Sequence, residues 1–291
     1  MHFTGNIYRP PQEANTPLLQ ITAGCSHNSC AFCSMYKEVP FRVSPMEELE
    51  EDLRELQGRN PYYKSIYFTG GDPFVLSTKR LKEIIDKVRE YLPMVEKVSM
   101  YGRVSNIAGK SLEELKELRK MGLYHLYMGP ESGDDETLKR MNKEQTAEEV
   151  IKECKKLDKA GIGYSVSYLN GLAGPERGET HAIKTAEMYN QLNPALVGAM
   201  SLTLFEDTDL YEDLKKGNFK ESSELERILE LKVFLEHLEI ETMILGHPTG
   251  SVSFYGRFPE DKEELLKKLQ WEIDHFDEEF YRRKRENTRN I

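Results

Sequence analysis

The spacing of apolar and polar positions predicts alternating strands and helices over the first two thirds of the chain. Short apolar runs typical of buried strands occur at Leu18–Ala23, Ser65–Thr69, Lys97–Tyr101, Leu123–Met128, Gly163–Leu169 and Leu196–Leu204. Helical spacing separates them at Pro45–Leu56, Thr78–Tyr91, Ser111–Met121, Thr146–Ala160 and Glu179–Gln191. Six strand–helix repeats of this kind predict an α/β fold with a parallel sheet and crossover helices.

Local capping signals support these boundaries. Ser111 with Glu114, and Thr146 with Glu149, each form the sequence pattern of a capping box, while Gly122 and Gly161 follow two of the helices. The later patterns at Ser222–Ile240 and Pro259–Arg282 are rich in Glu and Lys and are expected to be solvated outer helices. We therefore expect an arm at 1–16, a core at 17–205 and a helical or lid-like extension at 206–291.

Composition and charge narrow the class of protein. A chain of 291 residues with 38% apolar content can bury a full core as one catalytic domain. A net charge of −10 argues against a nucleic-acid partner, because phosphate binding depends on clustered Lys and Arg. No apolar stretch is long enough to cross a bilayer and no leader is visible, so we expect a cytoplasmic protein without a membrane partner.

Three of the four cysteines lie on one short segment. Cys25, Cys30 and Cys33 directly follow the first predicted strand, whereas Cys154 falls in a helical pattern, where a free cysteine is usually a small packed hydrophobe. Three thiolates on one loop can hold three irons of a [4Fe–4S] cluster and leave the fourth iron open to a small molecule. A zinc site that includes His27 is the alternative, and it needs four ligands in a closed tetrahedron.

With Phe32 immediately before Cys33, the loop resembles the cluster loop of the radical S-adenosylmethionine (SAM) enzymes. Four residues, Ser26 to Ser29, separate the first two cysteines, whereas the commonest spacing in that family has three. The resemblance implies a [4Fe–4S] cluster and SAM as cofactors, with Phe32 among the residues that contact SAM. It also implies a partial (β/α)6 TIM-type barrel, in which the chemistry gathers at the carboxyl ends of the strands.

Two further segments at predicted strand ends fit this resemblance. Thr69–Phe74 is similar to the family's Gly-Gly-Glu-Pro element, which implies that Gly70, Gly71, Asp72 and Pro73 bind the amino group of the SAM methionine. Ordinary turn chemistry is the alternative. Arg103 follows the third strand and could pair with the SAM carboxylate, or it could form a surface ion pair.

The fourth and fifth strands also end in family-like segments. Met128–Gly133 resembles the Gly-x-Glu-Ser-Gly of the branch that includes the oxygen-independent coproporphyrinogen oxidases and the methylthiotransferases, as does Leu138–Lys143 downstream. This implies that Glu131 accepts hydrogen bonds from the ribose of SAM, although a helix-capping carboxylate is the alternative. Leu169–Gly174 is similar to the branch's Gly-Leu-Pro-Gly turn, with Ala173 in place of Pro, which implies that Leu169 and Gly171 contact adenine.

The resemblance predicts an enzyme in which a reduced cluster cleaves SAM and the 5′-deoxyadenosyl radical abstracts hydrogen from a small-molecule substrate. A reduced ferredoxin or flavodoxin is the implied electron donor. The segment Leu245–Phe258 carries His247, Tyr255 and Arg257, and it is either a loop that closes the barrel mouth over substrate or a simple connection. The rival functions are a non-enzymatic iron–sulfur carrier or sensor, and a coproporphyrinogen-type decarboxylase; the sequence does not identify the substrate.

Overall fold

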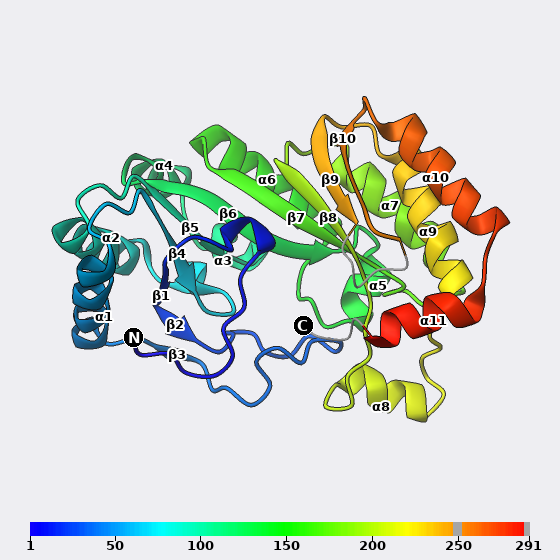
Figure 1. The fold of residues 1–291 in the computed structure, drawn as a ribbon, viewed down its shortest axis with the longest axis horizontal. Coiled ribbons are helices and arrows are strands. Elements are labelled where there is room, and N and C mark those ends of the chain that lie inside the picture. The colour runs from blue at the N-terminus through cyan, green and yellow to red at the C-terminus, as the bar shows by residue number, and fades with distance from the viewer. Residues whose placement is uncertain (247–251, 288–291) are drawn as a thin grey trace. The chain divides into compact units, whose positions relative to one another are not determined.

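The computed structural model describes residues 1–246 and 252–287, in which the strands form an eight-stranded sheet and a separate two-stranded sheet (Figure 1). The eight strands follow the order β1-β4-β5-β6-β7-β8-β9-β10, with bounds Leu18–Gln20, Ser65–Thr69, Lys97–Tyr101, Leu123–Glu131, Gly163–Asn170, Leu196–Ser201, Thr242–Gly246 and Phe254–Phe258. The pairs β1–β4, β4–β5, β5–β6, β7–β8 and β8–β9 are parallel, and β9–β10 is antiparallel. The predicted α/β class with a partial (β/α)6 barrel core is confirmed.

One strand prediction and one loop prediction were wrong in detail. The first apolar run is broken at Ile21, because Leu18–Gln20 pairs with β4 whereas β2 (Thr22–Ala23) pairs with β3 (Arg42–Val43). The predicted loop Leu245–Phe258 contains the end of β9 and all of β10, so the segment after residue 205 is not purely helical. In β10 the side chains alternate between buried and exposed, which is the period of a strand with one covered face.

The chain groups into two compact units, which are described separately below. The first contains Met1–Asn28, Cys33–Met128 and Lys155–Tyr164, and the second contains Ser29–Phe32, Gly129–Cys154 and Ser165–Ile291. This grouping does not follow the predicted boundaries at 16 and 205, which stay a prediction. The cysteine loop passes through both units, because Cys25 and Cys33 belong to the first and Cys30 to the second.

Three of the four α-helices of the first unit form where the sequence predicts them, and the short α3 (Val104–Ala108) was not predicted. The other three are α1 (Met46–Arg59), α2 (Thr78–Tyr91) and α4 (Leu112–Lys120), and the unit also has the short 3-10 turns η1 (Pro11–Glu13) and η2 (Pro73–Val75). In α2 the buried residues recur at the spacing of one helical face: Leu81, Ile84, Ile85 and Val88. The capping box of Ser111 and Glu114 is present, with Glu114 N donating to Ser111 Oγ at 3.1 Å.

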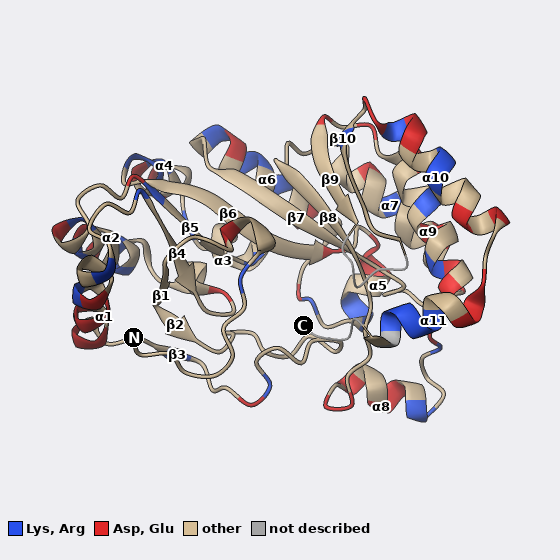
Figure 2. Cartoon of the chain, in the orientation of Figure 1, with Lys and Arg blue, Asp and Glu red and all other residues tan. Residues whose placement is uncertain are grey.

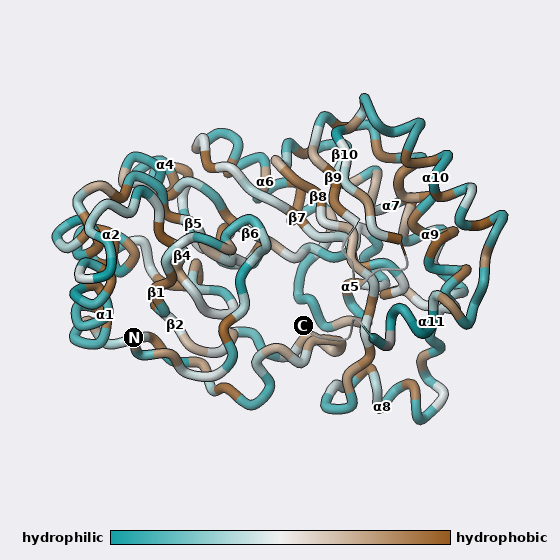
Figure 3. The backbone as a smooth tube through the Cα atoms, in the orientation of Figure 1, coloured by the Kyte–Doolittle hydropathy of each residue, from teal (hydrophilic) through white to brown (hydrophobic). Residues whose placement is uncertain are grey.

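The second unit carries the remaining helices. They are α5 (Asp135–Arg140), α7 (Gly178–Tyr189), α8 (Asp209–Lys215), α9 (Glu224–His237), α10 (Lys262–Asp274) and α11 (Glu278–Asn287), while α6 (Ala147–Ala160) runs from this unit into the first. Charged residues line the helices and leave the strands largely free of charge (Figure 2), and the strands are the most apolar segments (Figure 3). No helix within the described ranges is long and apolar enough to cross a membrane.

Candidate functional site

The first cysteine is packed against the turn that follows β4. Gly71 N donates to Gly24 O at 2.8 Å, and a Cβ built on Gly71 would lie 2.6 Å from the Cβ of Cys25. Gly24 itself has φ of +70°, a left-handed conformation that favours glycine. Glycine is therefore required on both sides of this contact, so the predicted SAM-binding turn and the start of the predicted cluster loop lie side by side.

Asp72 connects the same two segments through its side chain. Its carboxylate is fully buried and accepts hydrogen bonds from Ser26 N at 2.8 Å and from Ser26 Oγ at 2.5 Å. Asn106 Nδ2 lies 3.5 Å from the same carboxylate. The resemblance assigns Asp72 to the SAM amino group, and the structure shows that both of its oxygens already have partners in the protein.

Burial raises the pKa of the Cys25 thiol to about 11, and the charge of Asp72 adds to this shift. The backbone N–H groups of Asn28 and His27 and the positive charge of Arg103 act in the opposite direction. Arg103 lies two residues after the end of β5, and its backbone N–H donates to Asn106 Oδ1 at 2.8 Å. The positive charge of Arg103 thus favours the thiolate form of Cys25. The contact of Arg103 with a SAM carboxylate stays a prediction.

The loop is also closed by contacts within the first unit. Asn28 has φ of +44°, and its Nδ2 donates to Tyr36 O at 2.9 Å. The Tyr36 ring is buried and lies edge-on to Tyr8 at 5.4 Å between centroids. Tyr36 at the end of the cysteine segment is therefore held to Asn28 by a hydrogen bond and to Tyr8 of the N-terminal arm by aromatic packing.

Residues 29–32 are held by the end of α5 and the start of α8. Ala31 N donates to Met141 O at 3.0 Å, Leu210 N donates to Ala31 O at 2.9 Å, and Asn142 Nδ2 donates to Ser29 O at 2.9 Å. Sequence reasoning noted the family-like Leu138–Lys143 but did not assign it this role. Its Met-Asn pair supports the backbone next to Cys30.

Phe32 and Leu169, both predicted to contact SAM, meet in one apolar cluster of the second unit. Leu169 is part of this cluster and Phe32 packs against it; the other buried members are Ala31, Met141, Leu172, Leu202, Leu210 and Phe219. Gly171 has φ of +79°, and its N–H donates to Glu230 Oε1 at 2.9 Å. The turn after β7 is thus fixed by a carboxylate from α9, a residue that sequence reasoning missed.

Glu131 ends β6 in a left-handed conformation, with φ of +68°. This conformation is rare for a residue with a Cβ and clusters at functional sites. Ser167 Oγ donates to Glu131 Oε2 at 2.9 Å, and Lys143 Nζ donates to Gly129 O at 2.7 Å. Burial raises the pKa of Glu131, while the Lys143 charge and the Ser167 hydrogen bond oppose this shift. The predicted contact of Glu131 with the ribose of SAM stays a prediction.

Two of the three predicted substrate residues belong to a strand. Tyr255 and Arg257 lie on β10, where Tyr255 is 66% exposed and Arg257 is also exposed. Arg257 pairs with Met243, which pairs with Leu196 at the start of β8, so it lies at the amino end of these strands. Glu131 lies at the carboxyl end of its own strand, β6. His247 lies outside the described residues.

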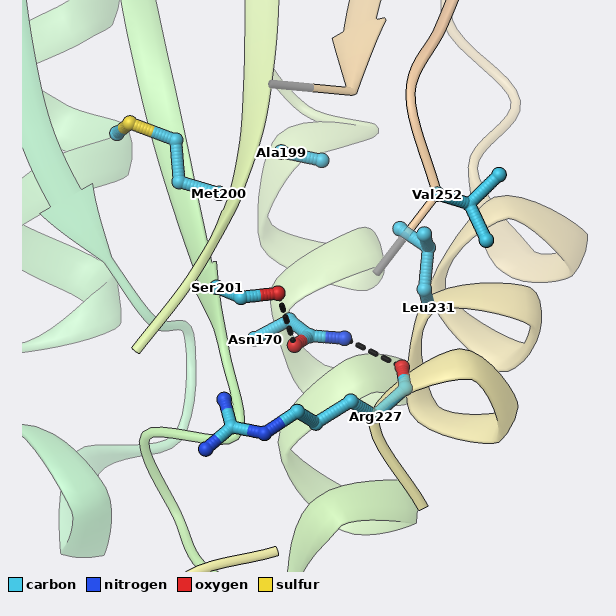
Figure 4. Close-up of a pocket in the computed structure, with 7 residues that line it drawn as sticks. All are labelled: Asn170, Ala199, Met200, Ser201, Arg227, Leu231 and Val252. Carbon is cyan, nitrogen blue, oxygen red and sulfur yellow. Dashed lines mark hydrogen bonds between the residues drawn. The ribbon is translucent and has the colours of Figure 1, made fainter. Parts of the chain in front are cut away.

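A small cavity lies at the carboxyl ends of β7 and β8 (Figure 4). It holds about 10 Å³, the lower bound for one water molecule. Among its lining residues, Arg227 is fully buried and donates to Glu221 Oε1 at 2.9 Å and to Leu202 O at 3.1 Å. Ser201 Oγ donates to Asn170 Oδ1 at 3.1 Å. The cavity is too small for a substrate, and its polar groups are paired with one another.

The comparisons with known proteins identify the family. The Radical SAM superfamily model matches residues 19–188, more than half of the chain, so the protein belongs to the radical SAM superfamily. A heme chaperone, HemW, of Bacillus subtilis is 25% identical over 66% of this chain and 52% of its own length. An uncharacterized protein of Methanocaldococcus jannaschii is 27% identical over 78% of this chain and 72% of its own.

The fold agrees with this family. The radical SAM coproporphyrinogen III oxidase HemN of Escherichia coli superposes with a TM-score of 0.56 at 16% identity, covering 76% of this chain and 51% of that one. The chain thus spans about half the length of HemN and of the Bacillus heme chaperone. The predicted family, the branch related to coproporphyrinogen oxidase and the enzymatic class are confirmed.

The protein is a radical SAM enzyme whose cofactors are a [4Fe–4S] cluster and SAM. The residues present fit these groups, since the thiols of Cys25, Cys30 and Cys33 are partly exposed, whereas Cys154 is fully buried inside α6. Within the described residues, no three His, Cys, Asp or Glu side chains are gathered as a metal site. The choice of cysteines therefore rests on the loop spacing and on the family.

Proposed function

We propose that Cys25, Cys30 and Cys33 hold the cluster and that the enzyme abstracts hydrogen from a small-molecule substrate. The observation that carries the proposal is the direct contact between the cysteine loop and the turn after β4, through Gly71 N to Gly24 O and Ser26 to Asp72. When bound, the cluster and SAM supply a 5′-deoxyadenosyl radical that takes a hydrogen atom from the substrate.

The chain's own residues have the chemistry to bind SAM. Gly70 and Gly71 have no side chain to cover their backbone, so their carbonyls can accept from an ammonium group. Arg103 supplies a guanidinium that can pair with a carboxylate in two-pronged geometry. Glu131 accepts ribose hydroxyls, and the apolar cluster around Leu169 keeps water from the adenine.

Anaerobic reconstitution with iron and sulfide tests the cluster assignment. We expect the wild-type protein to bind one [4Fe–4S] cluster and, once reduced, to form 5′-deoxyadenosine from SAM. Cys30→Ala should lose the cluster. Cys154→Ala is the matched control and should keep it, because Cys154 is fully buried in a helix. A variant set in which Cys154→Ala loses iron and Cys30→Ala retains it contradicts the assignment.

A coproporphyrinogen-type decarboxylation is the second candidate reaction. It is favoured by the similarity to a coproporphyrinogen III oxidase and to heme chaperones, of which this chain covers about half. Incubation of the reconstituted enzyme with coproporphyrinogen III and SAM tests it by the release of CO₂. A non-enzymatic iron–sulfur carrier or sensor has no need of the β4 turn, and it would form no 5′-deoxyadenosine.

The proposal includes an electron donor and a cellular setting. A reduced ferredoxin or flavodoxin supplies the electron in a cytoplasm that keeps the four cysteines reduced. A nucleic-acid substrate is disfavoured by the net charge of −10. Comparing turnover with reduced flavodoxin and with dithionite tests the donor; turnover with dithionite alone contradicts it.

A further inference from the structure

Asp72 and Ser26 form a contact that the resemblance to the family does not explain. The two residues are 46 positions apart, and they make two hydrogen bonds, one from the amide and one from the hydroxyl of Ser26. Ser26 directly follows Cys25, so any movement of Ser26 moves the backbone that carries the first cysteine. We propose that Asp72 is a positioning residue for the cluster loop and acts through Ser26 rather than by binding the SAM ammonium.

The packing around Asp72 supports this role. Its side chain is fully buried, and its two oxygens are both used: Oδ1 accepts from Ser26 N, whereas Oδ2 accepts from Ser26 Oγ. Asn106 also contacts the carboxylate, with its Nδ2 3.5 Å from Asp72 Oδ2, while Asn106 Oδ1 accepts from Arg103 N. A ligand ammonium would have to displace one of these partners to reach the carboxylate.

The contact also bears on the two ways in which this chain departs from the family pattern. The loop has one residue more than usual between Cys25 and Cys30, and Asp72 stands where Glu is usual. The carboxylate meets the first of the four intervening residues, and Asn28, the third, is held separately through Tyr36 O. Each of these two contacts restricts the backbone conformations that an added loop residue would otherwise allow.

The inference rests on the proposed function only for its consequences in the loaded enzyme, and its first test uses the protein without metal. Amide hydrogen exchange at position 26 should be about ten- to a hundredfold faster in Asp72→Ala, because this variant loses the charged acceptor of the amide hydrogen bond. Exchange should be faster by a smaller factor in Ser26→Ala, which keeps the amide bond and loses the hydroxyl bond. Ser26→Thr keeps the hydroxyl and should restore slow exchange. Asp134→Asn changes another fully buried carboxylate, in the second unit, and should leave exchange at Ser26 unchanged.

The second test separates the two possible roles of Asp72 in the reconstituted protein. If Asp72 positions the loop, Ser26→Ala and Asp72→Ala both lower iron content, and the double variant is no worse than Asp72→Ala. Asp72→Asn keeps an oxygen acceptor but removes the charge, so it should retain iron and shift the cluster potential to a more positive value.

The inference is overturned if Ser26→Ala matches the wild type in exchange, iron and SAM affinity while Asp72→Ala loses SAM affinity alone. That result would return Asp72 to the ammonium of SAM. A wild-type protein that assembles no cluster would instead refute the proposed function. The contact between Asp72 and Ser26 would then be judged from the exchange measurement in the metal-free protein.

Discussion

Gly71→Ala should prevent cluster assembly, because the structure leaves no room for a methyl group at this position. The new Cβ would lie 2.6 Å from the Cβ of Cys25, 2.8 Å from its Cα and 2.8 Å from Gly24 O. Separations below 3.0 Å are essentially never seen for real Cβ atoms, and two of these three neighbours are backbone atoms that cannot rotate away. The φ angle of Gly71 is not in the left-handed region, so the whole effect is steric.

Relief of this overlap requires the first cysteine and the β4 turn to separate by several tenths of an ångström. Overpacking of this kind costs about 1–3 kcal/mol, and the separation moves Cys25 away from its place in the loop. We therefore expect Gly71→Ala to lower the thermal midpoint of the metal-free protein and to reduce the iron bound per chain after anaerobic reconstitution.

Gly58→Ala is the matched control. Gly58 lies in α1 of the same unit, and a Cβ there would meet nothing within 4 Å. Alanine in a helix is more favourable than glycine by about 0.5–1 kcal/mol, so this variant should be slightly more stable and bind iron normally. Normal iron uptake and an unchanged thermal midpoint in Gly71→Ala would refute the reasoning.

Two further predictions concern stability. Glu230→Ala should lower the free energy of unfolding, measured with urea, by about 3–5 kcal/mol, because Glu230 Oε1 accepts from Tyr168 Oη, Gly171 N and His181 Nδ1. The control is Glu236→Ala, at an exposed position on the same helix, which should cost less than about 1 kcal/mol. Burial lowers the pKa of His125 to about 4. Between pH 6.5 and pH 4 the folded protein therefore keeps this ring neutral, whereas the unfolded chain binds a proton. The free energy of unfolding should decrease as the pH is lowered across that window. His125→Phe should flatten this dependence in urea midpoints measured from pH 7 to pH 4, and an equally steep loss in the variant would contradict the assignment.

Local sequence signals determined the order of most strands and helices of the core. Period-2 and period-3.6 patterns, capping boxes at Ser111 and Thr146, and glycines with positive φ at 122 and 161 depend on neighbouring residues, so they can be read from the chain itself. The cysteine spacing and the strand-end motifs pointed to the family for the same reason. The C-terminal strands were missed because β10 alternates over only five residues and follows a glycine-rich segment.

Tertiary structure alone decided what the candidate site residues contact. Asp72 meets Ser26 across 46 residues, and Glu230 meets Gly171 across 59. Ala31 forms backbone hydrogen bonds with Met141 and Leu210, which lie far along the chain. No periodicity encodes such pairs, because they arise only when parallel strands bring their carboxyl ends to one edge of a sheet. The sequence therefore indicated which residues are candidates for the chemistry, and the packing of distant segments determined what those residues contact.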